Sequence, residues 1–286
     1  MTRAIQPLPQ IQWQLPQTIA DVFQETLALT RRLFIQLYRR PSTLIAGLVQ
    51  PLMWLVLFGA LFQKAPDIFL GEGVSYGRFV GAGIIVFTAF GGALNAGLPV
   101  MFDREFGFLN RLLVAPLASR MSIVFASALF IVSMSLLQTL AIVGLNVFLG
   151  NPIGGLAGLG LVLAVIALVV VMVTAISLGL AFALKGHIEL LAVIFVVNLP
   201  LLFASTALAP LAFMPTWLQT IACANPLSWA IEVIRYVYVQ PTWEWSAGAL
   251  NAPWGSMSIG LCMGLLVACA GLALAAVRPL LMRRLG

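Results

Sequence analysis

A short polar segment between two long apolar runs carries the residues whose types could do chemistry. Its charged core is Asp103-Arg104-Glu105, and Arg111 and Arg120 follow. Two carboxylates this close are the minimum for general acid–base catalysis. Here they flank an arginine at the edge of an apolar run, where water solvates them. We therefore interpret residues 99–120 as a docking loop for a soluble partner and not as a catalytic pair.

The same loop has an apolar side, formed by Phe106, Phe108 and Leu112. A short helix with such a side fits a groove on a partner protein. The alternative is a plain solvated turn, but a turn does not need two phenylalanines exposed to water. The residues expected to contact the partner are Asp103, Arg104, Glu105, Phe106, Gly107, Phe108, Arg111 and Leu112.

The rest of the sequence contains no recognisable catalytic or metal-binding motif. It has no GxxxxGK[ST] loop for nucleotide phosphates and no GxSxG elbow. His187 is the single histidine, and the three cysteines lack metal-ligand spacing. We expect no catalytic residue, no metal and no cofactor in this chain.

Composition places these residues in a membrane protein. Of 286 residues, 62% are hydrophobic and 8% are charged, against about 25% charged in soluble domains. Such a chain cannot present a surface compatible with water, so we expect an all-α integral membrane protein. We attribute the net charge of +6 to membrane topology and do not expect a nucleic-acid partner.

Six apolar runs predict six membrane-spanning helices. They cover about residues 43–62, 79–100, 122–149, 156–184, a fifth that starts near 188, and 254–277. Residues 1–16 are polar and rich in proline and glutamine, which predicts a flexible N-terminus. Residues 17–286 then form one transmembrane domain.

Residues 17–40 predict an amphipathic helix that lies in the membrane interface. Phe23 belongs to its apolar face. Its basic residues are Arg31, Arg32, Arg39 and Arg40. Pro41 ends the helix before the first span.

The segment 212–253 mixes prolines with tryptophans and tyrosines, residues that favour the headgroup level. We expect two short helices here, Trp217–Cys223 and Leu227–Val239, that enter the outer leaflet without crossing it. Glu232 and Arg235 are three residues apart and either pair with each other or gate an outer exit.

The distribution of Lys and Arg predicts orientation. With six spans and both termini cytosolic, only Lys64, Arg78 and Arg235 lie outside. This bias favours a multi-pass protein of the cell (plasma or inner) membrane with both termini in the cytosol.

Several amides lie within the predicted spans, where facing lipid is costly. Each either holds helices together or lines a transport path, and Asn95 and Asn198 are the better path candidates. An ion-coupled transporter would need carboxylates in the middle of its spans, and each Asp and Glu here falls in a loop or at a span end.

Three segments resemble the permease subunits of type-2 ABC exporters, which move drugs, lipids and polysaccharides. The first is the amphipathic helix ending Arg39-Arg40-Pro41. The second, residues 103–120, is similar to the family pattern of acidic-Gly…Leu-Leu-x-x-Pro-x-Ser-Arg. The third, residues 210–218 with 224–235, is similar to the family's Pro…Met-Pro…Asn-Pro…Arg signature.

The resemblance implies a homodimer or heterodimer of two permease chains in membrane lipid, with two copies of a separate ATPase subunit that binds ATP and magnesium. The docking loop would be the coupling helix, and the interfacial helix would also touch the ATPase. The cargo would be a lipid, a drug-like amphipathic molecule or a polysaccharide. A scaffold or assembly factor that recruits a soluble partner without transport is the alternative.

Overall fold

The computed structural model describes residues 19–39, 41–61, 76–107, 119, 121–150, 154–240 and 242–285. Within these ranges the chain is mostly helical. The helices are α1 (Ile19–Tyr38), α2 (Pro41–Leu61), α4 (Tyr76–Leu94), α5 (Gly97–Glu105), α7 (Met121–Phe148), α8 (Gly155–Ala183), α9 (His187–Phe203), η1 (Leu211–Phe213), α10 (Thr216–Ala224), α11 (Pro226–Val239) and α12 (Ile259–Leu285). Strands β1 (Gly248–Ala252) and β2 (Gly255–Ser258) pair antiparallel.

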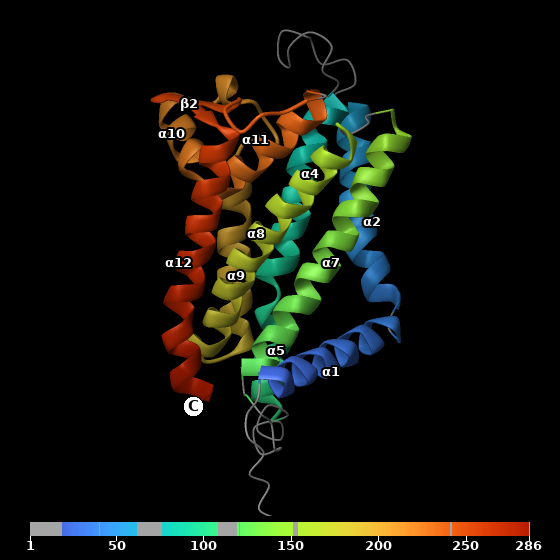
Figure 1. Ribbon diagram of the computed structural model, residues 1–286, viewed down its shortest axis with the longest axis vertical. Helices are drawn as coiled ribbons and strands as arrows, with labels where there is room; N and C mark the ends of the chain where they lie inside the picture. Colours follow the sequence, from blue (N-terminus) through green and yellow to red (C-terminus); the bar gives the residue numbers. More distant parts are fainter. Residues whose placement is uncertain are drawn as a thin grey trace, which may run out of the picture.

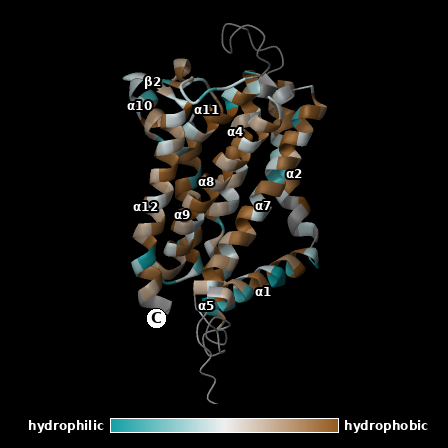
Figure 2. Ribbon diagram, in the orientation of Figure 1, coloured by the Kyte–Doolittle hydropathy of each residue, from teal (hydrophilic) through white to brown (hydrophobic). Residues whose placement is uncertain are grey.

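Long apolar helices form a bundle whose lengths suit a bilayer (Figure 1). Four stretches in the described residues are long and apolar enough to cross a membrane: Phe79–Glu105, Met121–Phe148, Gly155–Ala183 and Ile259–Met282. Two shorter apolar helices, Gly47–Leu61 within α2 and His187–Phe203, run beside them. Hydrophobic residues extend along these helices between the two ends of the bundle (Figure 2), as expected where lipid replaces water.

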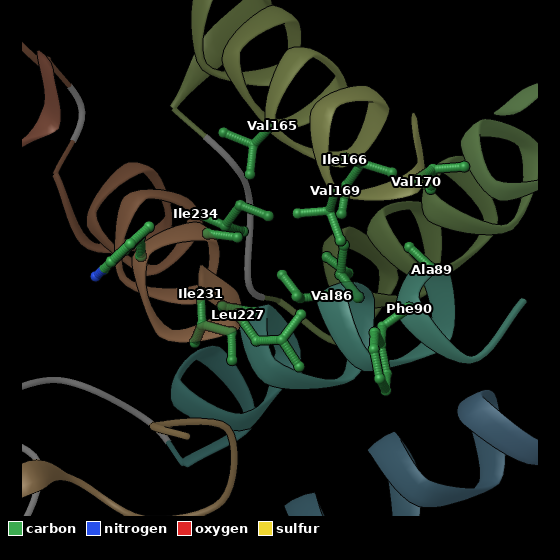
Figure 3. Packing of buried hydrophobic residues seen from close by; sticks show 14 of the residues in the cluster. Val86, Ala89, Phe90, Val165, Ile166, Val169, Val170, Leu227, Ile231 and Ile234 are labelled. Atoms are coloured by element: carbon green, nitrogen blue, oxygen red, sulfur yellow. The ribbon is translucent and has the colours of Figure 1, made fainter. Parts of the chain in front are cut away.

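Helix α8 is the centre of the bundle because its residues are apolar on every side. It packs against α4, α5, α7, α11 and α12. Figure 3 shows Val165, Ile166 and Val169 of α8 among side chains of α4 and α11. All three valine and isoleucine side chains are fully buried, so α8 is the element against which the others are positioned.

The two ends of the bundle differ. Helix α1 crosses one end, where α12 also finishes, and α10, α11 and the hairpin cover the other (Figure 1). The two short helices predicted within 212–253 are confirmed as α10 and α11. The hairpin was not predicted, and it delays α12 to Ile259, five residues after the expected start of the last span.

The chain between α9 and η1 is non-helical, and side chains of α11 satisfy its backbone. The Asn225 amide donates to the carbonyls of Leu201 and Ala204, at 3.0 and 2.7 Å. The Thr206 N–H donates to the Ser228 hydroxyl at 3.2 Å. Buried backbone groups need such partners. The hydrogen bonds of Asn225 therefore explain why an asparagine stands at this position.

Gly83 lets this non-helical segment lie directly on α4. A Cβ on Gly83 would lie 2.4 Å from the Ala207 carbonyl oxygen, whereas a Cβ on Gly91 of the same helix would meet nothing within 4 Å. We expect Gly83→Ala to destabilise the protein by about 1–3 kcal/mol because backbone must shift. Thermal unfolding in mild detergent measures this, with Gly91→Ala as control. Equal melting of the two variants would contradict the close approach.

Candidate functional site

The span expected over residues 79–100 is broken near its end. Helix α4 stops at Leu94 and α5 starts at Gly97. Pro99 explains the break, because proline has no N–H to donate to the carbonyl four residues earlier and its ring clashes there. At the break, the Leu98 N–H donates a hydrogen bond of 3.1 Å to the Asn95 carbonyl, three residues earlier and not four as in an α-helix.

One hydroxyl of α8 closes the break. Ser177 is fully buried; its Oγ donates to the Leu94 carbonyl at 2.6 Å and accepts from the Gly97 N–H at 2.9 Å. A Cβ on Gly97 would lie 2.5 Å from the Ser177 carbonyl oxygen, so the contact requires glycine. The bend therefore sets the direction of α5 relative to α8.

Arg104, near the end of α5, caps the C-terminus of α8. Its guanidinium donates to the carbonyls of Ala181 at 2.8 Å, Leu184 at 2.5 Å and Lys185 at 2.7 Å. The last carbonyls of a helix lack partners within it and carry the negative end of its dipole, so a cation there is stabilising. Arg104 ties α5 to the end of α8.

Glu105, the next residue, caps the N-terminus of α9. Its Oε1 accepts from the His187 N–H at 2.6 Å, and its Oε2 lies 2.6 Å from His187 Nδ1. A Cβ on Gly186 would lie 2.9 Å from Oε1, so the glycine makes room for the carboxylate. The ring of Phe102 lies against the His187 ring, with centroids 5.1 Å apart. A carboxylate is favoured at the positive end of a helix.

The two charges together form a clamp, defined here as Arg104 and Glu105 with their partners on residues 181–187. Arg104 holds the end of α8 and Glu105 holds the start of α9. Lys185 and Gly186 belong to the short bend between these helices, and His187 is the first residue of α9. The end of α5 is thereby connected to both helices.

Helix α1 is attached to α7 by a third cap. Glu25 accepts from the Ser119 N–H at 3.2 Å and from the Ser122 hydroxyl at 3.0 Å, at the start of α7. Thr30 is buried against α7, and Asp103 of α5 interacts electrostatically with Arg32 of α1. Helices α1, α5 and α7 thus meet at one end of the bundle (Figure 1).

The loop residues expected to contact a partner divide into two groups. Asp103, Arg104 and Glu105 face other parts of the same chain. Phe106 is 79% exposed and Gly107 turns the chain with a φ of +75°, a conformation that favours glycine. Phe108, Arg111 and Leu112 lie outside the described residues.

The basic residues of α1 line an open groove. Arg31, Arg32 and Arg39 border it together with Ile35 and Gln36. Phe23, on the face predicted to be apolar, is 63% exposed. Arg40 lies outside the described residues.

The two amides proposed to line a path differ in environment. Asn95 lies at the break between α4 and α5 and is exposed, with its amide donating to the Gly91 carbonyl at 2.7 Å. Asn198 lies within α9, and its Oδ1 is buried without a hydrogen-bond partner in the described structure. The structure does not bring these two residues together by any contact.

The proposed outer gate is a buried ion pair. Arg235 is 8% exposed and pairs with Glu232, as the spacing predicted. Its guanidinium also donates to the Thr206 carbonyl at 2.6 Å and to the Phe79 carbonyl at 3.4 Å. It lies over the Phe79 ring, 3.7 Å from the centroid. Arg235 therefore joins α11, α4 and the chain after α9.

Sequence reasoning missed Ser177 and the cap role of Glu25, and it saw in His187 only a lone histidine. The partners described above for these three residues are 80 or more positions away along the chain. Pro99 inside an apolar run was the readable signal of the break. Within the described residues, no three His, Cys, Asp or Glu side chains gather as metal ligands. The hydrogen bonds of the site connect α5 with α8 and α9, and α1 with the start of α7.

Comparison with known proteins identifies the family of this chain. A family model described as ABC-2 type transporter matches residues 24–239. A protein of Porphyra purpurea named as a transport permease, ycf38, is 53% identical over 268 residues, 93% of this chain and 92% of its own length. The similarly named protein of Cyanophora paradoxa is 52% identical over 244 residues, covering 85% and 84%.

A more distant relative is named as a doxorubicin resistance ABC transporter permease, DrrC, of Mycobacterium tuberculosis. It is 27% identical over 234 residues, which cover 77% of this chain and 79% of that protein. The range matched by the family model includes the clamp residues at 103–105 and 181–187.

Proposed function

Because the chain belongs to the ABC-2 type transporter family, we propose that it is the transmembrane subunit of an ATP-driven exporter. Two permease chains pair, as a homodimer or heterodimer, and two copies of a separate ATPase subunit bind at the end that carries α1 and α5. The observation that carries the proposal is the clamp, which connects an exposed segment at that end to two helices of the bundle.

The proposed topology has six spans, made by α2, α4 with α5, α7, α8, α9 and α12. Helix α1 is proposed to lie in the cytosolic interface, since it crosses the end of the bundle and exposes Arg31 and Phe23. Helices α10 and α11 enter the outer leaflet. Both termini are cytosolic, in the plasma or inner membrane. Basic residues at the α1 end, such as Arg104 and Lys185, support this orientation.

The mechanism follows from the connections. The ATPase binds ATP and magnesium, and its closure displaces the segment around Phe106. Arg104 moves the end of α8 and Glu105 moves the start of α9, while Glu25 carries α7 with α1. The spans then rotate relative to one another and a path opens between the two permeases. Asn95 is exposed and is proposed to line that path; Asn198 is proposed to join it as α9 moves.

The cargo is proposed to be a lipid, a drug-like amphipathic molecule or a polysaccharide. The distant relative named for doxorubicin resistance favours an amphipathic molecule among these. Glu232 with Arg235 is proposed as the outer gate, because the pair joins three elements at the outer end and its rupture would release them together.

The alternative is a membrane scaffold that binds a soluble partner without transport. The exposed ring of Phe106 separates the two functions when its effect on a partner's ATP hydrolysis is measured. In an exporter, hydrolysis depends on this contact. In a scaffold, the partner binds but its hydrolysis is unaffected.

We expect Phe106→Ser to weaken association with the ATPase by roughly tenfold, about 1.4 kcal/mol, because one exposed aromatic anchor is lost. The readout is co-purification of a P-loop ATPase in mild detergent, followed by its ATP hydrolysis rate. Phe148→Ser is the matched control, since Phe148 is 86% exposed where α7 ends, far from α5 along the bundle. Retention of a fully active ATPase by Phe106→Ser would contradict docking at this segment.

A further inference from the structure

A cavity of about 560 Å³, open to the surface, lies at the end of the bundle that carries α10 and α11. Its walls come from the end of α10, from α11, from the hairpin and from the first turns of α12. Among the residues that line it are Cys223, Trp229, Trp254, Met257, Leu261 and Leu265. None of them belongs to the clamp or to the Glu232–Arg235 pair.

Two tryptophans give the cavity its shape. Trp229 is buried, and its indole N–H donates to the Cys223 carbonyl at 2.7 Å. Its polar atom is therefore satisfied and its ring is fixed. Trp254 is 58% exposed and stands in the turn between the two strands. Gly255 follows with a φ of +139°, which favours glycine and fixes where the second ring stands.

The chemistry of the lining selects an apolar occupant. No Asp, Glu, Lys, Arg or His side chain borders the cavity, and Ser256 supplies its one hydroxyl. A charged or strongly polar group would lose its hydration there without gaining a partner. Hydrocarbon loses nothing by the same transfer and gains contacts with two indole rings.

The cavity is continuous with a lipid-facing stripe of α12. Leu261, Leu265, Ala268 and Leu272 recur at helical spacing, and Leu272 is 70% exposed. In a bilayer this stripe contacts acyl chains, so the medium outside the cavity is hydrocarbon. Tryptophan at the mouth is typical of the headgroup level, which places a polar head beside Trp254 and Ser256.

We propose that this cavity binds the acyl chain of a membrane lipid from the leaflet on that side, with its tail along Leu261 and Leu265 and its head at Trp254. The site requires that the chain spans a membrane, but it does not require that the chain exports anything. A lipid held here packs between α11 and α12 and fills space that the protein leaves open.

The test uses the full chain in phosphatidylcholine nanodiscs that contain a trace of phosphatidylcholine with a photoreactive diazirine in its acyl chain. After irradiation, mass spectrometry locates the label. We expect labelling of Leu261 and Leu265 to exceed that of the more exposed Leu272. Even labelling in proportion to exposure would mean ordinary boundary lipid and would overturn the proposal.

A filling variant gives a second readout. Ala224 lines the cavity, and Ala224→Phe reduces the space for the chain. Each buried methylene excluded corresponds to about fourfold in binding, so we expect labelling to fall by at least about fourfold. Ala276→Phe, on the exposed side of α12 outside the cavity, is the control. Equal labelling of both variants would overturn the proposal. If Ala224→Phe does not fold, the proposal is tested by the distribution of label over Leu261, Leu265 and Leu272 in the wild-type protein.

Discussion

Replacing Arg235 by alanine is expected to lower the free energy of unfolding by about 3–5 kcal/mol, because it breaks a buried ion pair and leaves its partner uncompensated. Glu232 would remain as a mostly buried carboxylate, and the Thr206 carbonyl would lose its donor at 2.6 Å. Thermal unfolding of purified protein in mild detergent measures the effect.

The matched variant is Arg235→Lys, which keeps the charge and loses the planar fork that reaches several acceptors at once. We expect it to fall between the wild type and alanine. Glu244→Gln, an exposed carboxylate near the hairpin, controls for a change of charge at this end. If Arg235→Ala melted like the wild type, the pair would not hold α11 to α4.

Replacing Glu105 by arginine is expected to uncouple ATP hydrolysis from transport. The His187 N–H and the start of α9 lose their carboxylate, and a cation faces the positive end of a helix. Losing this cap weakens the connection between the end of α5 and the start of α9, so we expect less cargo to be moved for each ATP hydrolysed. Transport by proteoliposomes, with ATP hydrolysis measured in parallel, gives the ratio of cargo moved to ATP used.

Glu105→Gln retains an acceptor for the His187 N–H and should keep most of the coupling. Glu189→Gln, in the first turn of the same helix, is the control for charge. The expectation fails if Glu105→Arg loses the ATPase altogether while Phe106→Ser keeps it, because Glu105 would then be a docking residue and not part of the clamp.

Much of the helical architecture could be predicted from the sequence. A membrane span requires a continuous apolar run, and such a run is visible within one short stretch of sequence. Helices α10 and α11 were predicted within a residue or two, since the prolines at 215 and 226 fix where each starts. The hairpin was missed because the tryptophans of this segment were interpreted as residues at the headgroup level and the turn signals between them were not used. Gly255 after Pro253-Trp254 was a turn signal, and Leu250 and Met257 alternate as the buried residues of paired strands.

The segment proposed as the site was chosen from the sequence, but its contacts within the chain could not be predicted. The scarcity of charge in an apolar chain drew attention to Asp103-Arg104-Glu105. Their partners at residues 181–187 lie about 80 positions away, and spacing carries no information about such pairs. Arg104 and Glu105 were expected to face a partner protein, and the structure places them against helix ends of their own chain. Among the loop residues that the structure describes, Phe106 has a large apolar side chain that is exposed.

The hydroxyl of Ser177 also bears on the order of events during biosynthesis. Gly97 is synthesised eighty residues before Ser177. Helices α4 and α5 are therefore made before the hydroxyl that connects them. Before Ser177 is made, the Leu94 carbonyl and the Gly97 N–H lack its hydroxyl as a hydrogen-bond partner. The hydrogen bonds that fix the angle between α4 and α5 have then not formed. The segment that leads to Phe106 therefore takes its direction only after α8 has been synthesised.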